Sequence, residues 1–143
     1  IESKMEVMRM LRQITELESI GDSCYNLART LNRHRQNCTE QFTELELSNM
    51  HNMLDMVCKA MQHMGNVVEA ILSGNHVDYN TSYNLENEIN NYRRQLKNRN
   101  LQDVDNKLYS YQLGVFYIDF ISECEKLGDY ILNVVQATKA EKV

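Results

Sequence analysis

The chain has 143 residues, of which 43% are hydrophobic and 24% charged, and its formal net charge is −5 at pH 7. This length is sufficient for one domain with its own hydrophobic core. The sequence contains no proline and only 5 glycines, which excludes an all-β fold because hairpins and sandwiches need these residues at their turns. The negative charge argues against a nucleic-acid partner, because binding to nucleic acid requires a basic surface.

The chain lacks the features of a membrane-spanning or disulfide-linked protein. Its mean hydropathy is −0.53, and it has no run of about 18 apolar residues that could span a bilayer. The helical apolar pattern is already present at the first residues, which suggests a piece of a longer polypeptide. The four cysteines form no C-x-x-C motif, so we expect buried, reduced thiols and a cytoplasmic location. These cysteines are Cys24, Cys38, Cys58 and Cys124.

Apolar residues at steps of three and four predict two long helices in the first half of the chain. The first is expected from Met5 to about Cys38. The second is expected over residues 44–73, because Thr43 and Glu46 have the spacing of a capping box and Gly74 is a suitable C-terminal stop.

Two further helices are predicted in the second half. The third starts after a cap at Asp78 or Thr81 and reaches about Asn98, and a short break over residues 100–103 precedes a fourth helix from about 103 to 140. Short connections make successive helices antiparallel neighbours. We therefore expect residues 1–143 to form a single all-α domain, an up-down-up-down four-helix bundle with the first helix beside the fourth.

An internal repeat links the first and fourth helices. A shift of 107 residues places Ile14–Leu27 on Ile121–Val134, with identical residues at six positions. Each copy contains glutamate and aspartate four residues apart, so the two carboxylates share one helix face. The glycine between them, Gly21 or Gly128, is unfavourable inside a helix and suggests a close approach by a backbone or a ligand. A duplicated helix is therefore expected.

The repeated carboxylates are the candidate site. On the fourth helix, a heptad series that begins at Val104 continues through Glu125 and Asp129, so these acids are expected to interrupt the core stripe. With the first and fourth helices antiparallel, the two motifs should face each other at mid-height. Four carboxylates in one seam need protons, cations or water, and a divalent or ferric ion (Fe, Mn, Mg, Ni or Zn) is one solution. The candidate metal ligands are Glu18, Asp22, Glu125 and Asp129.

Residues 18–22 followed by Asn26-Leu27, and residues 125–129 followed by Asn133-Val134, resemble the twice-occurring E-R-I-G-D-x-x-x-N-I signature of PhoU proteins. The segment L-E-N-E-I-N at residues 85–90 resembles the L-E-x-x-I-D stretch of that family, with Asn90 in place of an acid. The resemblance implies a helical bundle whose E-x-x-x-D pairs can hold metal clusters. It also implies a non-catalytic, regulatory role in bacterial phosphate transport.

PhoU-like domains also form the cytoplasmic C-terminal part of bacterial sodium/phosphate cotransporters. This context implies that the domain is tethered at the inner face of the plasma membrane and that its partner is the membrane portion of the same chain or a transport complex. A homodimer is a further possible assembly. Basic residues near the ends of the first and third helices could form one pole that meets anionic lipid or the transporter. They include Arg29, Arg33, Arg35, Arg93, Arg94, Lys97 and Arg99.

Three alternatives stay open at this point. The chain could be a metal-free helical interaction or dimerisation module in which the acids are structural. It could be a stand-alone PhoU-type phosphate signalling protein. A di-iron oxidase is the enzyme alternative, but such sites use Glu-x-x-His motifs, and no histidine of this chain has glutamate three residues before it.

Overall fold

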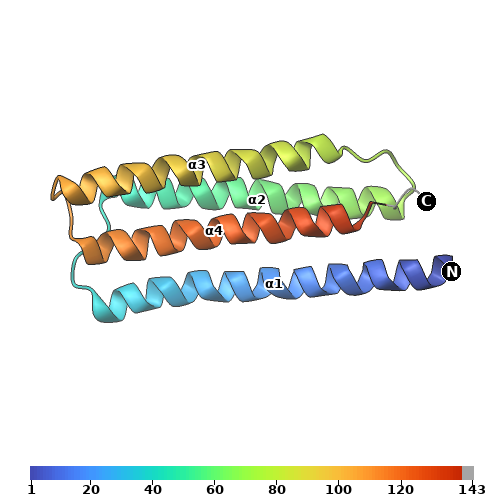
Figure 1. Cartoon of the computed structure of the whole chain (residues 1–143), viewed down its shortest axis with the longest axis horizontal. Helices are drawn as coiled ribbons and strands as arrows, with labels where there is room; N and C mark the ends of the chain where they lie inside the picture. Colours follow the sequence, from blue (N-terminus) through green and yellow to red (C-terminus); the bar gives the residue numbers. More distant parts are fainter. Residues whose placement is uncertain (140–143) are drawn as a thin grey trace.

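The computed structural model describes residues 1–139, which form four α-helices joined by short connections. They are α1 (Glu2–Asn37), α2 (Glu44–Leu72), α3 (Tyr79–Asp105) and α4 (Tyr111–Ala137). Figure 1 shows that successive helices run in opposite directions, and no strand occurs in this part of the chain. The predicted all-α, up-down-up-down four-helix bundle is confirmed.

The predicted ends of α2 are confirmed in detail. At its start, Glu46 N donates to Thr43 Oγ1 at 3.1 Å and Thr43 N donates to Glu46 Oε1 at 3.0 Å, which completes the capping box. At its end, Gly74 adopts a φ of 71°, a left-handed conformation that glycine takes without steric cost. Asp78 caps α3, as predicted, by accepting a hydrogen bond from Thr81 N.

The connection between α3 and α4 differs from the prediction. α3 continues through residues 100–103 to Asp105, and the break lies over residues 106–110. The polar residues that suggested an earlier break are satisfied inside the folded chain: Asn100 Oδ1 accepts from the Tyr109 hydroxyl at 2.6 Å, and Asp103 accepts from Arg99 at 3.0 Å. Val104 therefore belongs to α3, and the predicted helix end at residue 140 lies outside the described residues.

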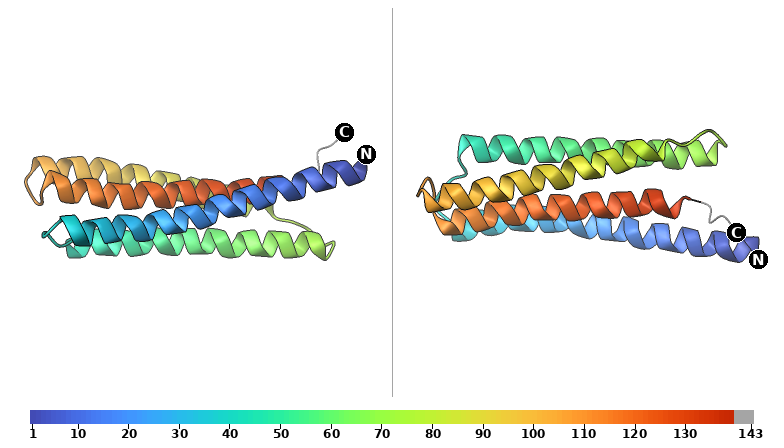
Figure 2. Two further views of the ribbon diagram at one scale, coloured as in Figure 1. Left: turned by 90° about the horizontal axis from the view of Figure 1, so that it is seen from below. Right: turned by 45° about the horizontal axis from the view of Figure 1, so that its top comes forward.

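α4 is the central helix of the bundle. It packs against each of the other three helices, and α2 and α3 also pack against each other. Helix α1 lies beside α4, as predicted, but within residues 1–139 none of its Cα atoms comes within 8 Å of a Cα atom of α2 or α3. Figure 2 shows α1 as the outermost helix along α4. The fold is thus a three-helix core of α2, α3 and α4 with α1 added along one side.

Packing of the core follows from this arrangement. Most of its buried apolar side chains come from α2 and α4, while α1 contributes only Ile20 and Leu27 among its apolar residues. The buried residues of α4 include Leu113, Tyr117, Phe120, Ile121, Cys124, Leu127, Ile131 and Val134. The other apolar side chains of α1 are largely exposed, so its amphipathic pattern is only partly used within the described chain.

All four cysteines are free, but only Cys38 and Cys124 are buried. The expectation that every thiol is buried is wrong for Cys24 on α1 and Cys58 on α2, which both occupy exposed positions of their helices. None of the described helices has the length and apolarity needed to cross a bilayer.

Candidate acidic site between α3 and α4

The first acidic motif lies on an exposed face of α1. Glu18 and Asp22 are both exposed, whereas the α4-facing side of α1 carries Ser23 and Asn26. Ser23 Oγ donates to Glu123 Oε1 at 2.6 Å. Because Glu18 precedes Ser23 by five positions, it points roughly 140° away around the helix. The expectation that the two motifs face each other is therefore wrong, although both lie in the middle parts of their helices.

The repeat instead forms a reciprocal pair of hydrogen bonds between α1 and α4. Asn26 Nδ2 donates to Glu123 Oε1 at 3.2 Å, and Asn133 Nδ2 donates to Glu16 Oε2 at 3.3 Å. The shift of 107 residues converts Asn26 into Asn133 and Glu16 into Glu123. Each bond thus joins the repeated asparagine of one helix to the repeated glutamate of the other, and this pair of bonds connects α1 to α4.

The second acidic motif faces α3. Arg93 Nε lies 2.5 Å from Glu125 Oε2, and Asp129 shares a hydrogen bond with Glu86. Asn90 Nδ2 donates to Glu86 Oε1 at 2.6 Å. We call these five residues the acidic cluster. Its three α3 members, Glu86, Asn90 and Arg93, were not among the residues predicted for the site, although Glu86 and Asn90 lie in the segment that resembles the L-E-x-x-I-D stretch of PhoU proteins.

The electrostatics of the acidic cluster follow from partial burial. Burial, the hydrogen bond with Glu86 and the charge of Glu125 all raise the pKa of Asp129, and Arg93 opposes them, so that the pKa is about 6. Two polar atoms of the cluster, Asn90 Oδ1 and Arg93 Nε, are buried without a hydrogen-bond partner. The contact between Arg93 and Glu125 is therefore an ion pair that lacks hydrogen-bond geometry at Nε. The raised pKa of Asp129 means that its neutral form is favoured beside the other carboxyl groups of the cluster.

The two repeated glycines differ in their surroundings. A Cβ atom at Gly128 would lie 3.2 Å from Ile89 Cδ1, so α3 approaches α4 closely at this point. A Cβ atom at Gly21 would have nothing within 4 Å. The close approach at Gly128 comes from a side chain of α3 and not from the backbone or ligand that was predicted, and no close approach by the described residues is observed at Gly21.

The carboxylates of Glu86, Glu125 and Asp129 are hard oxygen donors of the kind that bind Mg, Mn or Fe. In the described structure, the cation next to Glu125 is the guanidinium of Arg93. Within residues 1–139, no three histidine, cysteine, aspartate or glutamate side chains are arranged as a preformed metal site.

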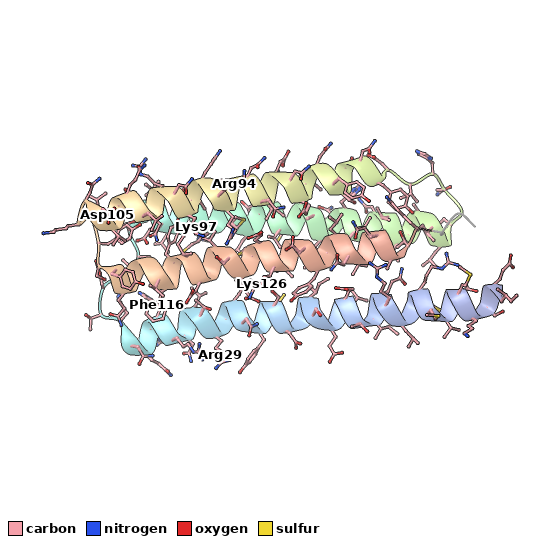
Figure 3. The ribbon with its side chains drawn as sticks, in the orientation of Figure 1. Arg29, Arg94, Lys97, Asp105, Phe116 and Lys126 are labelled. Carbon is pink, nitrogen blue, oxygen red and sulfur yellow. The ribbon has the colours of Figure 1, made fainter. Side chains whose placement is uncertain are left out.

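The basic residues share one end of the bundle without forming a single patch. Figure 3 shows Arg29 on α1 and Arg94 on α3, at opposite edges of the molecule with α4 between them. Arg93 is paired with Glu125. Arg29 and Lys126 line a groove between α1 and α4 that also contains acidic residues, so its charge is mixed.

The raised pKa of Asp129 predicts a pH-dependent stability. Because the pKa of Asp129 is about 6 in the folded chain and near 3.8, the ordinary value for aspartate, when the chain is unfolded, protonation favours folding, and this contribution is lost as the pH rises through about 6. We expect Asp129→Asn to raise the free energy of unfolding by about 1 kcal/mol at pH 8, a value reduced for solvent screening. Urea unfolding at several pH values, with a chelator present, measures this.

The matched control is Asp22→Asn, because Asp22 is the equivalent residue on α1 and is exposed. We expect this variant to keep the pH profile of the parent chain. A lower stability of Asp129→Asn at pH 8 would contradict the prediction, since it would mean that Arg93 makes the charged carboxylate favourable.

The chain was compared with protein-family models, curated proteins and solved structures, and no match was found in any of the three.

Proposed function

We propose that this chain is a PhoU-like, non-catalytic regulatory or accessory domain of bacterial phosphate transport, located on the cytoplasmic side of a sodium/phosphate cotransporter or its complex. The observation that carries the proposal is the meeting of two segments that resemble PhoU sequences. Asp129 of the second acidic motif shares a hydrogen bond with Glu86, and Glu86 accepts one from Asn90. Two segments about 40 residues apart in the sequence therefore contribute carboxyl and amide groups to one cluster.

The proposed ligand of the acidic cluster is a divalent or ferric cation. Glu125 and Asp129 would bind it, with Glu86 as a third carboxylate from α3. The cation would neutralise the carboxylates of Asp129 and Glu86 and would displace Arg93 from Glu125. Such a replacement is favourable because it removes the repulsion between carboxylates that are partly withdrawn from water. The exposed pair Glu18 and Asp22 is a weaker candidate, because only two carboxylates meet there.

Elemental analysis tests this site. The purified chain is exposed to Fe, Mn, Mg, Ni or Zn, passed through gel filtration and analysed for retained metal. We expect retention by the parent chain and loss in the double variant Glu125→Gln/Asp129→Asn. The matched control Glu18→Gln/Asp22→Asn makes the same changes on α1 and should retain the metal.

A second variant separates the roles of Arg93 and the acids. Arg93→Gln removes the competing cation and should increase the affinity of the acidic cluster for the metal by about tenfold or more, because the site no longer has to break an ion pair. Equal metal retention in the parent chain and in Glu125→Gln/Asp129→Asn would overturn the assignment of the site.

The transport role is tested separately in cells whose gene for this chain carries Glu125→Gln/Asp129→Asn. We expect altered phosphate uptake at low external phosphate, compared with cells that carry the control Glu18→Gln/Asp22→Asn. Uptake that is identical in all three strains would contradict the proposed role of this site in transport.

A metal-free helical interaction module is the second candidate function. The ion pair between Arg93 and Glu125 favours it, because the cluster is already partly neutralised without a metal. The exposed apolar side chains of α1 favour it as well. Absence of retained metal in every variant would select this function.

A further inference from the structure

A groove of about 470 Å³ lies between the beginning of α1 and the end of α4, at the end of the bundle where Figure 1 shows these two helix ends together. Three cationic side chains and two methionines line it, and it has no aspartate or glutamate in its lining. We call it the basic groove. Its lining residues are Met5, Met8, Arg9, Arg12, Gln136, Ala137 and Lys139.

The cations of the basic groove have no carboxylate partner within residues 1–139, although the chain as a whole carries a net charge of −5. In this part of the chain, the basic side chains that lie within 4.0 Å of a carboxylate are those of Arg93 and Arg99, on α3. Glu6 lines a different groove, and Glu16 accepts a hydrogen bond from Asn133. The basic groove therefore concentrates positive charge that an anion could neutralise.

Lys139 is held beside the basic groove by two tyrosines of α3. Its ammonium group donates to the Tyr83 hydroxyl at 2.6 Å and lies 4.7 Å from the centres of the Tyr79 and Tyr83 rings. The same hydrogen bond lowers the pKa of Tyr83. Because an ammonium group has three donors, Lys139 can keep this bond and still donate to a ligand. The groove thus combines one fixed cation from the end of α4 with two guanidinium groups from α1.

The two methionines give the basic groove an apolar side. Met8 is 61% exposed and Met5 is half-buried, so both are accessible beside the guanidinium groups. At the same end of the bundle, Leu72 at the end of α2 is 83% exposed. A free inorganic anion would gain nothing from these apolar side chains, whereas an anion attached to an acyl chain would bury them.

The internal repeat shows that the basic groove is not a core surface. The four α1 residues that line it correspond to α4 residues of which three are exposed and one, Phe116, is half-buried, although α2 and α3 pack against α4. Helices packed against α1 in the same way would therefore leave the groove open. The corresponding α4 residues are Gln112, Val115, Phe116 and Asp119.

We propose that the basic groove binds the phosphate group of an anionic phospholipid, with Met5 and Met8 against the first part of its acyl chains. Guanidinium groups can bind two phosphate oxygens at once, so Arg9 and Arg12 are the expected ligands, and Lys139 adds a third cation. Arg9 and Arg12 are three residues apart and therefore share one face of α1. Such binding would hold this end of the bundle at a negatively charged membrane surface. The proposal does not rest on the proposed function, because none of these residues belongs to the acidic cluster.

Co-sedimentation of the purified chain with lipid vesicles tests the proposal. We expect binding to vesicles that contain phosphatidylglycerol, and affinity lowered by about tenfold or more in Arg9→Gln/Arg12→Gln, because two of the three cations of the groove are lost. Binding should weaken as the salt concentration rises. A parent chain that does not bind these vesicles, or that binds vesicles of phosphatidylcholine alone equally well, would overturn the proposal.

The matched control is Arg29→Gln/Arg33→Gln. It removes the same charge from α1, but these two arginines line a second groove that also contains Asp119 and Glu123. We expect this variant to lose much less affinity for the vesicles. An equal loss in the two double variants would contradict the assignment of the site, because it would indicate a general attraction between the membrane and the cations of α1. Circular dichroism checks that each variant keeps its helices.

The variant Met8→Ser separates a phospholipid from a free phosphate ion. Loss of this apolar side chain should lower the affinity for phosphatidylglycerol vesicles several-fold. Isothermal titration calorimetry with inorganic phosphate should show much weaker binding than the vesicles give, and this weak binding should be the same in Met8→Ser and the parent chain. Vesicle binding that Met8→Ser leaves unchanged, or inorganic phosphate that binds as tightly as the vesicles, would overturn the assignment to a lipid.

Discussion

Replacement of Phe120 by alanine is expected to lower the free energy of unfolding by about 3–5 kcal/mol. Phe120 is 2% exposed and lies on α4, the only helix that packs against all of the others. Loss of the ring removes buried apolar area and leaves a cavity that α2 and α3 cannot close without losing other contacts. Guanidinium unfolding followed by far-UV circular dichroism measures the change.

The control for this prediction is Ile14→Ala on α1. Ile14 is 58% exposed, so the same type of truncation should change the stability of the monomer by less than about 0.5 kcal/mol. The measurement is made at a protein concentration at which the chain is monomeric. Similar losses of unfolding free energy for the two variants would contradict the fold, since they would mean that Ile14 is buried within the folded chain.

Gly114→Ala is expected to destabilise the chain by about 1–3 kcal/mol, the range for overpacking a buried site. A Cβ atom at this position would lie 2.8 Å from Val104 Cγ2 and 3.1 Å from Asn100 Oδ1. Neither neighbour can move freely, because Asn100 is held by hydrogen bonds from the Tyr109 hydroxyl and to the Gly114 carbonyl oxygen. Thermal unfolding monitored by circular dichroism tests the prediction.

The opposite sign is expected for Gly21→Ala. Nothing lies within 4 Å of a Cβ atom at Gly21, and alanine is favoured over glycine inside a helix by about 1 kcal/mol. The two substitutions make the same chemical change in helices related by the repeat. Stabilisation by Gly114→Ala would contradict the close packing of α3 on α4, and destabilisation by Gly21→Ala would contradict the open surroundings of Gly21.

The number, order and direction of the helices could be predicted from the sequence because the signals for them are local. The capping box at Thr43 and Glu46 and the left-handed Gly74 involve residues within one turn of each other, and both occur as predicted. The break between the third and fourth helices was misplaced. Asn100 and Asp103 resemble a connection in sequence, but their polar side chains are satisfied by Tyr109 and Arg99 inside the bundle.

The repeat was also visible in the sequence, but its structural role was only partly predictable. Spacing of four residues places Glu125 and Asp129 on one face of α4, and both side chains do point to one neighbour, α3. No local pattern indicated that the repeated Glu16 and Asn133 would form a hydrogen bond between α1 and α4. Arg93 was predicted to belong to a basic pole. Its pairing with Glu125 was not predictable from the sequence, because it depends on the distance between α3 and α4.

The sequence by itself determined which residues share a helix face, because the helical period of 3.6 residues is a property of each segment alone. It also determined that four such helices form an all-α bundle. Only the tertiary structure decided which neighbour each face meets. Helix α1 is rotated so that Ser23 faces α4 and Glu18 faces away, and its apolar row is left uncovered. The rotation of a helix about its axis depends on the packing of all its neighbours at once, and no local pattern specifies that sum.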